Sequence, residues 1–130
     1  MLLGMHPVEF EAGSATFAVV PGEQHLGASA PFAFAVYPRS TGVVHGGLAA
    51  TLLDSAMGCA VQTTLPAGAA YTTPELKVNF TRAITGETGR VLAHANVLHR
   101  GSCVATAEGR MVAESDGTLL AYGTTTCLAV

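Results

Sequence analysis

The sequence predicts an α+β fold in which an antiparallel sheet wraps around one long apolar helix. Across residues 43–61, apolar and small side chains recur on every side of a helix, and a helix that is hydrophobic all round is buried on all sides. After this helix, alternating apolar and polar runs are separated by turn residues, which is typical of strands joined by hairpins. A sheet that buries a single helix on all sides has to wrap it.

Before the helix, two short alternating runs at residues 8–11 and 15–20 predict a strand or a hairpin. Residues 22–29 are typical of a loop. Residues 32–37 are a further short strand candidate, which Pro38 closes.

The helix is expected to end between residues 63 and 65, because Pro66 and Gly68 follow. Its length of about 27 Å, at roughly 1.5 Å per residue, is the width of a small domain. It is too short and too interrupted by glycine to make a good membrane span, and it lacks flanking basic residues.

Four strands are predicted after the helix, at residues 76–81, 90–99, 103–114 and 119–128. Turn residues separate them, and Asp116-Gly117 is the strongest hairpin signal. We expect these four strands to form an antiparallel meander within one domain that spans residues 1–130.

The composition predicts a homo-oligomer. Charged residues make up 12% of the 130 residues and apolar residues 49%, whereas roughly 25% of an average soluble protein is charged. So few charges on a small domain indicate that partner subunits cover part of its surface. The formal net charge is −3 and the basic residues are scattered, so we expect no nucleic-acid partner.

The three cysteines are odd in number and lack the spacing of metal ligands, so we interpret them as reduced core thiols. No histidine pair has ligand spacing either, and no metal site is expected. Reduced thiols and an N-terminus without a signal peptide predict a cytoplasmic protein.

Asp54 lies within the apolar helix and is the only formally charged side chain between Arg39 and Glu75. A carboxylate in apolar surroundings is costly unless it is paired, hydrogen-bonded or protonated. A functional role would explain it. The alternative is a structural Asp that hydrogen-bonds the backbone or Ser55.

Three motifs resemble the hotdog-fold thioesterases of the PaaI-like family. They are His45-Gly46-Gly47 with Asp54 nine residues after the histidine, the run at residues 75–80, and the run at residues 99–102. The resemblance extends from about residue 41 to the C-terminus. It implies a hotdog fold, with a curved antiparallel sheet around a long central helix, and dimers that usually pair into tetramers, with active sites at the dimer interface. It also implies hydrolysis of acyl-coenzyme A (acyl-CoA) without metal or cofactor.

The resemblance favours Asp54 as the catalytic acid. Thioester hydrolysis needs a base that activates water or a carboxylate that attacks the carbonyl, and an Asp can do either. The sequence leaves both roles open.

Gly46 and Gly47 are expected at the start of the helix, where backbone N–H groups and the helix dipole favour negative charge. They could form an oxyanion hole for the attacked carbonyl, or simply allow a tight turn. His45 could donate to the carbonyl or orient the loop, or hydrogen-bond the backbone of the first turn.

The resemblance implies further substrate contacts. The family often carries Asn or Gln six residues before the histidine, where this chain has Arg39, with Ser40 beside it. It often has a Ser or Thr after the helix that holds the attacking water in the neighbouring subunit's site. Thr73 aligns best and Thr72 is the other candidate, unless they only lead into a strand. Met57 and Val61 would line the acyl pocket.

Coenzyme A phosphates could bind arginine, which suits bidentate phosphate contacts. The candidate residues are Arg82, Arg100 and Ser102, with Gly101 allowing close backbone approach.

The sequence therefore predicts an acyl-CoA thioesterase acting on an aromatic or medium-chain acyl group, without a cofactor. One alternative is a non-catalytic module that binds acyl-CoA, because a fold alone does not define an activity. A third and less favoured hypothesis is a hotdog dehydratase. Such an enzyme needs a catalytic His paired with an acid, and it carries Pro-rich signatures near the helix start, which this chain lacks.

Overall fold

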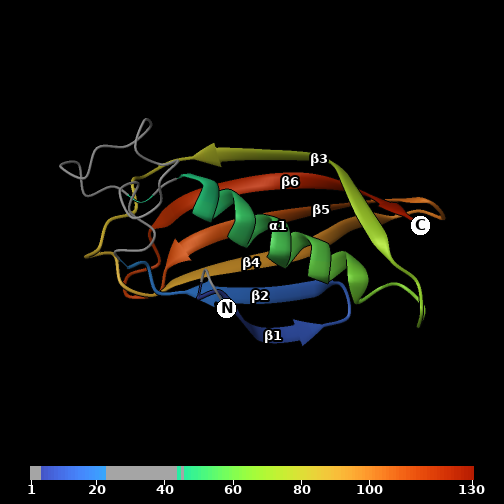
Figure 1. Cartoon of the computed structure of the whole chain (residues 1–130), viewed down its shortest axis with the longest axis horizontal. Helices are drawn as coiled ribbons and strands as arrows, with labels where there is room; N and C mark the ends of the chain where they lie inside the picture. The colour runs from blue at the N-terminus through green and yellow to red at the C-terminus, as the bar shows by residue number, and fades with distance from the viewer. Residues whose placement is uncertain (1–3, 23–43, 45) are drawn as a thin grey trace.

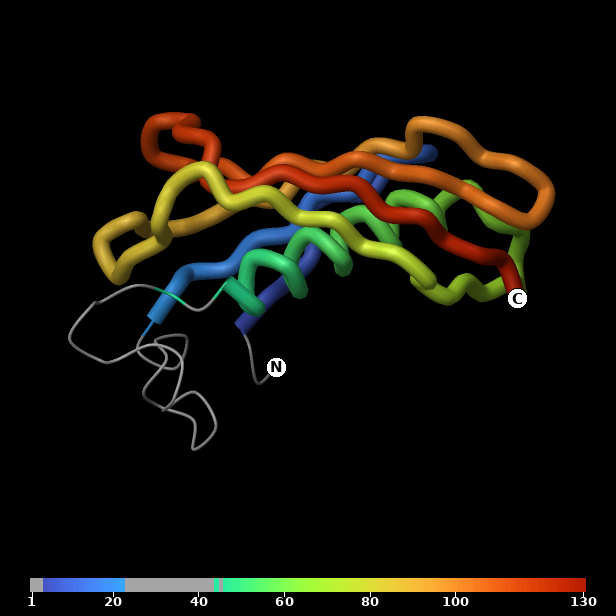
Figure 2. The backbone as a smooth tube through the Cα atoms, turned by 90° about the horizontal axis from the view of Figure 1, so that it is seen from above, coloured from blue at the N-terminus to red at the C-terminus, as the bar shows by residue number. Residues whose placement is uncertain are grey.

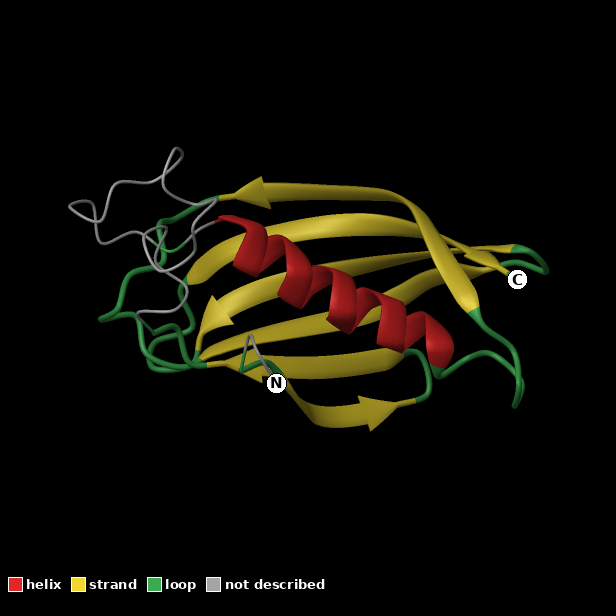
Figure 3. Ribbon diagram, viewed as in Figure 1, coloured by secondary structure: helices red, strands yellow, loops and turns green. Residues whose placement is uncertain are grey.

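The computed structural model describes residues 4–22, 44 and 46–130. Six antiparallel strands form one curved sheet, and a single helix lies across its concave face (Figure 1). Figure 2 shows the sheet edge-on with the helix on one side, and Figure 3 shows the helix crossing the strands obliquely. In chain order the elements are β1 (His6–Glu11), β2 (Ser14–Val19), α1 (Gly46–Gln62), β3 (Tyr71–Phe80), β4 (Val91–Arg100), β5 (Val104–Ala113) and β6 (Leu119–Ala129).

The order of strands in the sheet is β1-β2-β4-β5-β6-β3. The predicted four-strand meander is therefore wrong, because β3 pairs with β6 at the edge and β4 pairs with β2 and β5. Helix α1 carries the chain from the β2 side of the sheet to the opposite edge. The connection at residues 81–90 then returns it to the centre. Three strand spacings make about 14 Å, a distance that such a connection spans easily.

The alternating N-terminal runs form the β1–β2 hairpin, which confirms that prediction. The strand candidate at residues 32–37 and the predicted loop after Gly22 lie outside the described residues. The Asp116-Gly117 hairpin signal is also confirmed. Gly117 has φ 74°, and the Thr118 N–H donates to Asp116 Oδ1 at 3.0 Å, a geometry that suits Gly and Asp.

Hydrogen bonds fix helix α1 at both ends. Before its start, the Val44 N–H donates to the Ile84 carbonyl at 2.8 Å, which ties the helix to the β3–β4 loop. After its end, Thr63 Oγ1 donates to the Ala60 carbonyl at 2.6 Å and accepts from the Gly13 N–H at 2.8 Å. The helix is thus anchored to the β3–β4 loop at its start and to the β1–β2 hairpin at its end.

The sheet covers one side of α1, where Leu52, Leu53 and Met57 are fully buried. On the other side Thr51 is exposed, and Asp54 and Ser55 are half-buried. The expectation of a helix buried on all sides is therefore not met within the described part of the chain, because a single curved sheet cannot enclose a helix. The apolar composition of the helix exceeds what these residues cover.

Strand β3 begins at Tyr71, earlier than the alternation from residue 76 predicts. The reason is a register shift between Thr72 and Glu75, which inserts one extra residue opposite β6 and breaks the alternation. Thr125 Oγ1 donates to the Glu75 carbonyl at 2.8 Å and so stabilises the bulge.

Candidate active site

Strand β3 runs along α1 in the opposite direction, and an aromatic ring of β3 lies over a glycine of α1 at each end of the contact. A Cβ added to Gly46 would lie 3.2 Å from Cζ of Phe80, and one added to Gly58 would lie 2.1 Å from the hydroxyl of Tyr71. We call this strip, bounded by these two glycine–aromatic contacts, the α1/β3 seam.

Asp54 lies between the two ends of the seam and is half-buried. Gly58 is four residues further along the helix, so it shares a helix face with Asp54. Burial raises the pKa of the Asp54 carboxyl above its usual value. Among the described residues, no ion pair or hydrogen bond to this carboxyl offsets the burial. The structural alternative, an Asp54 held by Ser55 or by the backbone, therefore has no support in the described part of the chain.

Gly46 is the first residue of α1, as predicted, and Gly47 is the second. The N–H groups in the first turn of a helix have no acceptor within the helix. The Gly47 carbonyl accepts from Thr51 Oγ1 at 2.7 Å. His45 and Arg39 lie outside the described residues.

Thr73 and Tyr71 of β3 lie near the thiol of Cys127 on β6. Burial raises the pKa of Cys127, and hydrogen bonds from Thr73 and Thr125 lower it. Burial also raises the pKa of Tyr71 to about 12, helped by Cys59, Cys127 and Asp54. Tyr71 therefore stays protonated at neutral pH, and the charge of Asp54 is close enough to act on it. Thr72, one residue before Thr73, is exposed.

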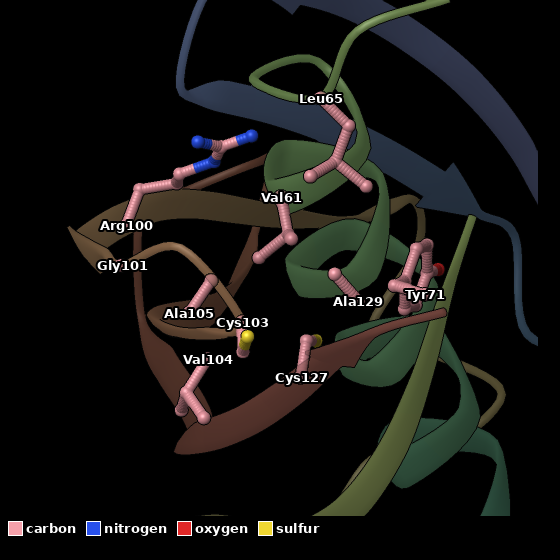
Figure 4. A pocket seen from close by; sticks show the side chains of 10 residues that line it. All are labelled: Val61, Leu65, Tyr71, Arg100, Gly101, Cys103, Val104, Ala105, Cys127 and Ala129. Carbon is pink, nitrogen blue, oxygen red and sulfur yellow. The ribbon is translucent and has the colours of Figure 1, made fainter. Parts of the chain in front are cut away.

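The C-terminal end of α1 adjoins a small pocket that is mostly apolar. Val61 of α1 lies across it from Cys127, with Tyr71 and Leu65 at its edge (Figure 4). The pocket measures about 10 Å³, roughly the space of one water molecule. Val61 lines this pocket, whereas the structure buries Met57 in the core against Gly109 of β5. The role of Val61 in an acyl pocket stays a prediction.

The opposite end of the sheet holds a larger and more polar cavity, of about 170 Å³. The β3–β4 loop and the β5–β6 hairpin form it, and it includes Arg82, Glu87, Thr88, Ser115, Asp116 and Thr118. Hydrogen bonding from the Thr118 backbone holds the pKa of Asp116 below its usual value.

The predicted phosphate-binding residues do not come together within one chain. Arg82 lies near the start of β4, whereas Arg100 ends that strand and Gly101 and Ser102 follow it. Ten residues at roughly 3.3 Å each separate the two groups by about 30 Å. The local fold also explains why residue 101 is a glycine. Its N–H donates to the Val104 carbonyl at 2.8 Å, and an added Cβ would lie 2.8 Å from that oxygen.

The cysteines differ in environment. Cys127 is buried and Cys59 half-buried, whereas Cys103 is exposed just before β5, so it is not a core thiol. The described residues contain no group of three or more His, Cys, Asp or Glu side chains that could hold a metal ion. They also contain no helix long and apolar enough to cross a membrane.

Sequence reasoning missed Tyr71 and Phe80, the two rings that bound the seam. A signal for Tyr71 was present, because Gly58 interrupts an otherwise helix-favouring segment and such a glycine usually has a packing reason. The identity of its partner depends on which strand lies beside the helix, which the sequence pattern does not reveal.

The sequence profile of the thioesterase superfamily matches residues 41–120, and the chain belongs to this superfamily. A curated protein of Halobacterium salinarum named as a "putative esterase" is 42% identical over 77 residues, which cover 58% of this chain. The match covers only 49% of that relative's length.

Solved structures share the fold over nearly the whole chain. A thioesterase family protein from Silicibacter pomeroyi is 26% identical with a TM-score of 0.81, over 98% of this chain and 85% of its own. A conserved protein from Pseudomonas aeruginosa is 27% identical with a TM-score of 0.82, over 99% and 90%. The PaaI protein from the phenylacetic acid degradation operon of Escherichia coli has a TM-score of 0.80 at 19% identity, over 98% and 80%. The last likeness concerns the fold alone, and it agrees with the hotdog architecture that the sequence predicted.

Proposed function

We propose that this protein hydrolyses acyl-CoA thioesters and that Asp54 is its catalytic carboxylate. The observation that carries the proposal is the half-buried carboxyl of Asp54, which no ion pair or hydrogen bond within the described ranges compensates and whose pKa burial raises. A carboxylate that is kept in such a place at a cost to stability is typical of an active site. Membership of the thioesterase superfamily supplies the reaction class.

In this reaction the oxygen of water attacks the thioester carbonyl carbon and the C–S bond breaks. As a base, Asp54 takes the proton of the attacking water, and the proton passes to the departing thiolate of coenzyme A. As a nucleophile, Asp54 first forms a mixed anhydride, which water then hydrolyses. In both routes the carbonyl oxygen gains negative charge, which the start of α1 at Gly46 can stabilise.

The site is completed by a second copy of the chain in this proposal. The concave side of β3 carries Leu76, which is 38% exposed, and Phe80, which is 58% exposed. As an outer strand of the described sheet, β3 also presents an unpaired edge, which favours pairing with another chain. A second subunit over this side would cover the open face of α1 beside Asp54 and could contribute Thr73, His45 or Arg39. A cytoplasmic location stays a prediction.

The test is a set of acyl-CoA substrates assayed by release of free thiol, with Asp54→Asn beside the wild type. We expect kcat/KM to fall by about a hundredfold or more, because the amide can neither accept the proton nor attack. The matched control is Glu108→Gln, the same change at an exposed position of β5, which should keep wild-type activity.

Two results would overturn the proposal. If Asp54→Asn keeps full activity, another group is the catalyst. If the wild type binds acyl-CoA and cleaves none of the substrates, the protein is the binding module that the sequence left as an alternative.

A further inference from the structure

The α1/β3 seam is covered by an aromatic ring on both sides of Asp54, and the ring on the Gly58 side packs far more closely. Towards the C-terminal end of α1, the Tyr71 phenol lies directly over Gly58, so close that no side chain fits between them. Gly58 is four residues beyond Asp54, about 6 Å at 1.5 Å per residue. The strip of helix face beside Asp54 therefore ends at Tyr71 after about one turn.

Beyond Tyr71 lies the small apolar pocket at the end of the helix. Val61, seven residues after Asp54 and on a similar helix face, lines it together with Cys127 and Ala129 (Figure 4). Tyr71 itself lines the same pocket. Tyr71 thus stands between Asp54 and an apolar cavity that is too small, at about 10 Å³, to hold more than one water.

The two ends of the seam differ in polarity. The C-terminal end adjoins the apolar pocket, with Arg100 at its outer rim (Figure 4). The larger polar cavity, with Arg82 and several hydroxyl groups, lies at the end of the sheet where β3 finishes, two residues beyond Phe80. A thioester has one apolar arm, the acyl group, and one polar arm, coenzyme A. Burial in apolar surroundings favours the acyl arm at the Tyr71 end.

We infer that Tyr71 sets the length of the acyl group, so that the substrates are compact acyl-CoAs, namely short aliphatic chains or a single aromatic ring. This inference rests on the proposed function. About 6 Å of seam holds about four carbons of an extended chain, at roughly 1.25 Å per bond projected from standard geometry. Longer straight chains collide with the phenol, which packing against Gly58 holds in place. On this inference, aromatic acyl groups stay among the expected substrates and medium-chain acyl groups do not.

The experiment compares kcat/KM for acetyl-, butyryl-, benzoyl-, octanoyl- and dodecanoyl-CoA in the wild type and in Tyr71→Ala. We expect the wild type to prefer butyryl- over dodecanoyl-CoA by about tenfold or more, a usual size for a pocket that rejects added methylene groups. Tyr71→Ala should raise the dodecanoyl-to-butyryl ratio by about tenfold or more, because the ring that stops the chain at Gly58 is then absent.

Three controls accompany this variant. Tyr71→Phe keeps the ring and should keep the wild-type length profile. Tyr122→Ala removes an exposed tyrosine of β6 and should leave both the profile and the activity unchanged. Tyr71→Leu, a milder truncation, provides a folded intermediate if Tyr71→Ala unfolds, and it should shift the ratio in the same direction.

Failure of this inference is distinct from failure of the proposed function. Equal kcat/KM for butyryl- and dodecanoyl-CoA in the wild type would overturn the inference and leave the hydrolase proposal intact. A Tyr71→Ala effect on KM that is the same for every acyl group would also overturn it, because coenzyme A would then be the arm that passes Tyr71. If the wild type cleaves no thioester, the binding affinities of the same esters are measured with Asp54→Asn. Tighter binding of butyryl- than of dodecanoyl-CoA would then support the length limit, and equal binding would overturn it.

Discussion

A glycine of α1 lies under an aromatic ring of β3 at each end of the α1/β3 seam, but the two contacts differ in how closely the ring packs. At the start of α1, Gly46 lies under Phe80, whose ring is 58% exposed and would crowd an added Cβ, at 3.2 Å. Near the helix end, Gly58 lies under a half-buried Tyr71 whose hydroxyl occupies the place of a Cβ, at 2.1 Å. An added Cβ would therefore meet an exposed ring that can shift at one end, and a phenol that leaves it no room at the other. The Gly46 end is where we place the oxyanion, and the Gly58 end is where we place the limit of the acyl group.

The largest expected effect on stability is the difference between alanine substitutions at these two glycines. Gly58→Ala should lower the free energy of unfolding by about 2 kcal/mol, within the usual range for overpacking, although alanine favours a helix by about 1 kcal/mol. Gly46→Ala should change it by less than about 0.5 kcal/mol, because the exposed Phe80 ring can shift. Chemical denaturation measures both.

The double variant Gly58→Ala with Tyr71→Ala sharpens this test. Without the phenol, the alanine should become stabilising relative to Tyr71→Ala alone, since only helix propensity remains. A Gly58→Ala cost that persists without Tyr71 would contradict the contact between the two residues.

The second prediction concerns the pH dependence of activity. Burial raises the pKa of Asp54, so the acidic limb of kcat/KM should have its midpoint above the ordinary Asp value of about 3.9. Below that midpoint activity should fall about tenfold per pH unit, because the carboxyl must be ionised to act as base or nucleophile. If the midpoint of the acidic limb lies at or below the ordinary pKa of Asp, the carboxyl is exposed to water rather than half-buried in the seam, which contradicts the prediction.

A smaller effect is expected at the polar end of the sheet. Arg90 Nη1 donates to Glu114 Oε2 at 2.6 Å, and both side chains are substantially exposed. Arg90→Gln should therefore cost about 0.5 kcal/mol of stability, less in high salt. The thermal midpoint in low and high salt checks this. A cost as large as that of Gly58→Ala would mean that the polar end is held as tightly as the apolar end.

The smallest effect is on the stability of Asp54→Asn. A raised folded-state pKa means that the folded chain holds the proton after the unfolded chain has lost it. The stabilising contribution is complete below about pH 3.9 and is lost as the pH rises through the folded pKa. Asn removes this loss, so the variant should be more stable at neutral pH by about a few tenths of a kcal/mol, after allowance for solvent screening. Equal stability at neutral pH would show that the carboxylate is compensated.

Local sequence patterns predicted the elements well, because each depends on neighbours along the chain. The helix, the β1–β2 hairpin and the Asp116-Gly117 turn all follow from periodicity and turn chemistry, although the helix ends at Gln62, just before the predicted residues 63–65. The start of β3 was missed because the bulge after Thr72 breaks the alternation on which the prediction relied. The roles of Gly46, Gly47, Thr73 and the other site residues stay predictions, as do the assignment of residues 1–130 to one domain and the roles of His45 and Arg39.

By itself, the sequence determined that one apolar helix carries a lone carboxylate, Asp54, and that an antiparallel sheet packs against that helix. The tertiary structure alone decided the strand order that places β3 against β6, and hence that Phe80 lies on Gly46 and Tyr71 on Gly58. It also decided that Arg82 and Arg100 lie at opposite ends of the sheet. The physical reason is that hydrogen bonding within a helix or turn is local, whereas strand pairing joins residues far apart in the chain and any of several edges satisfies the same pattern.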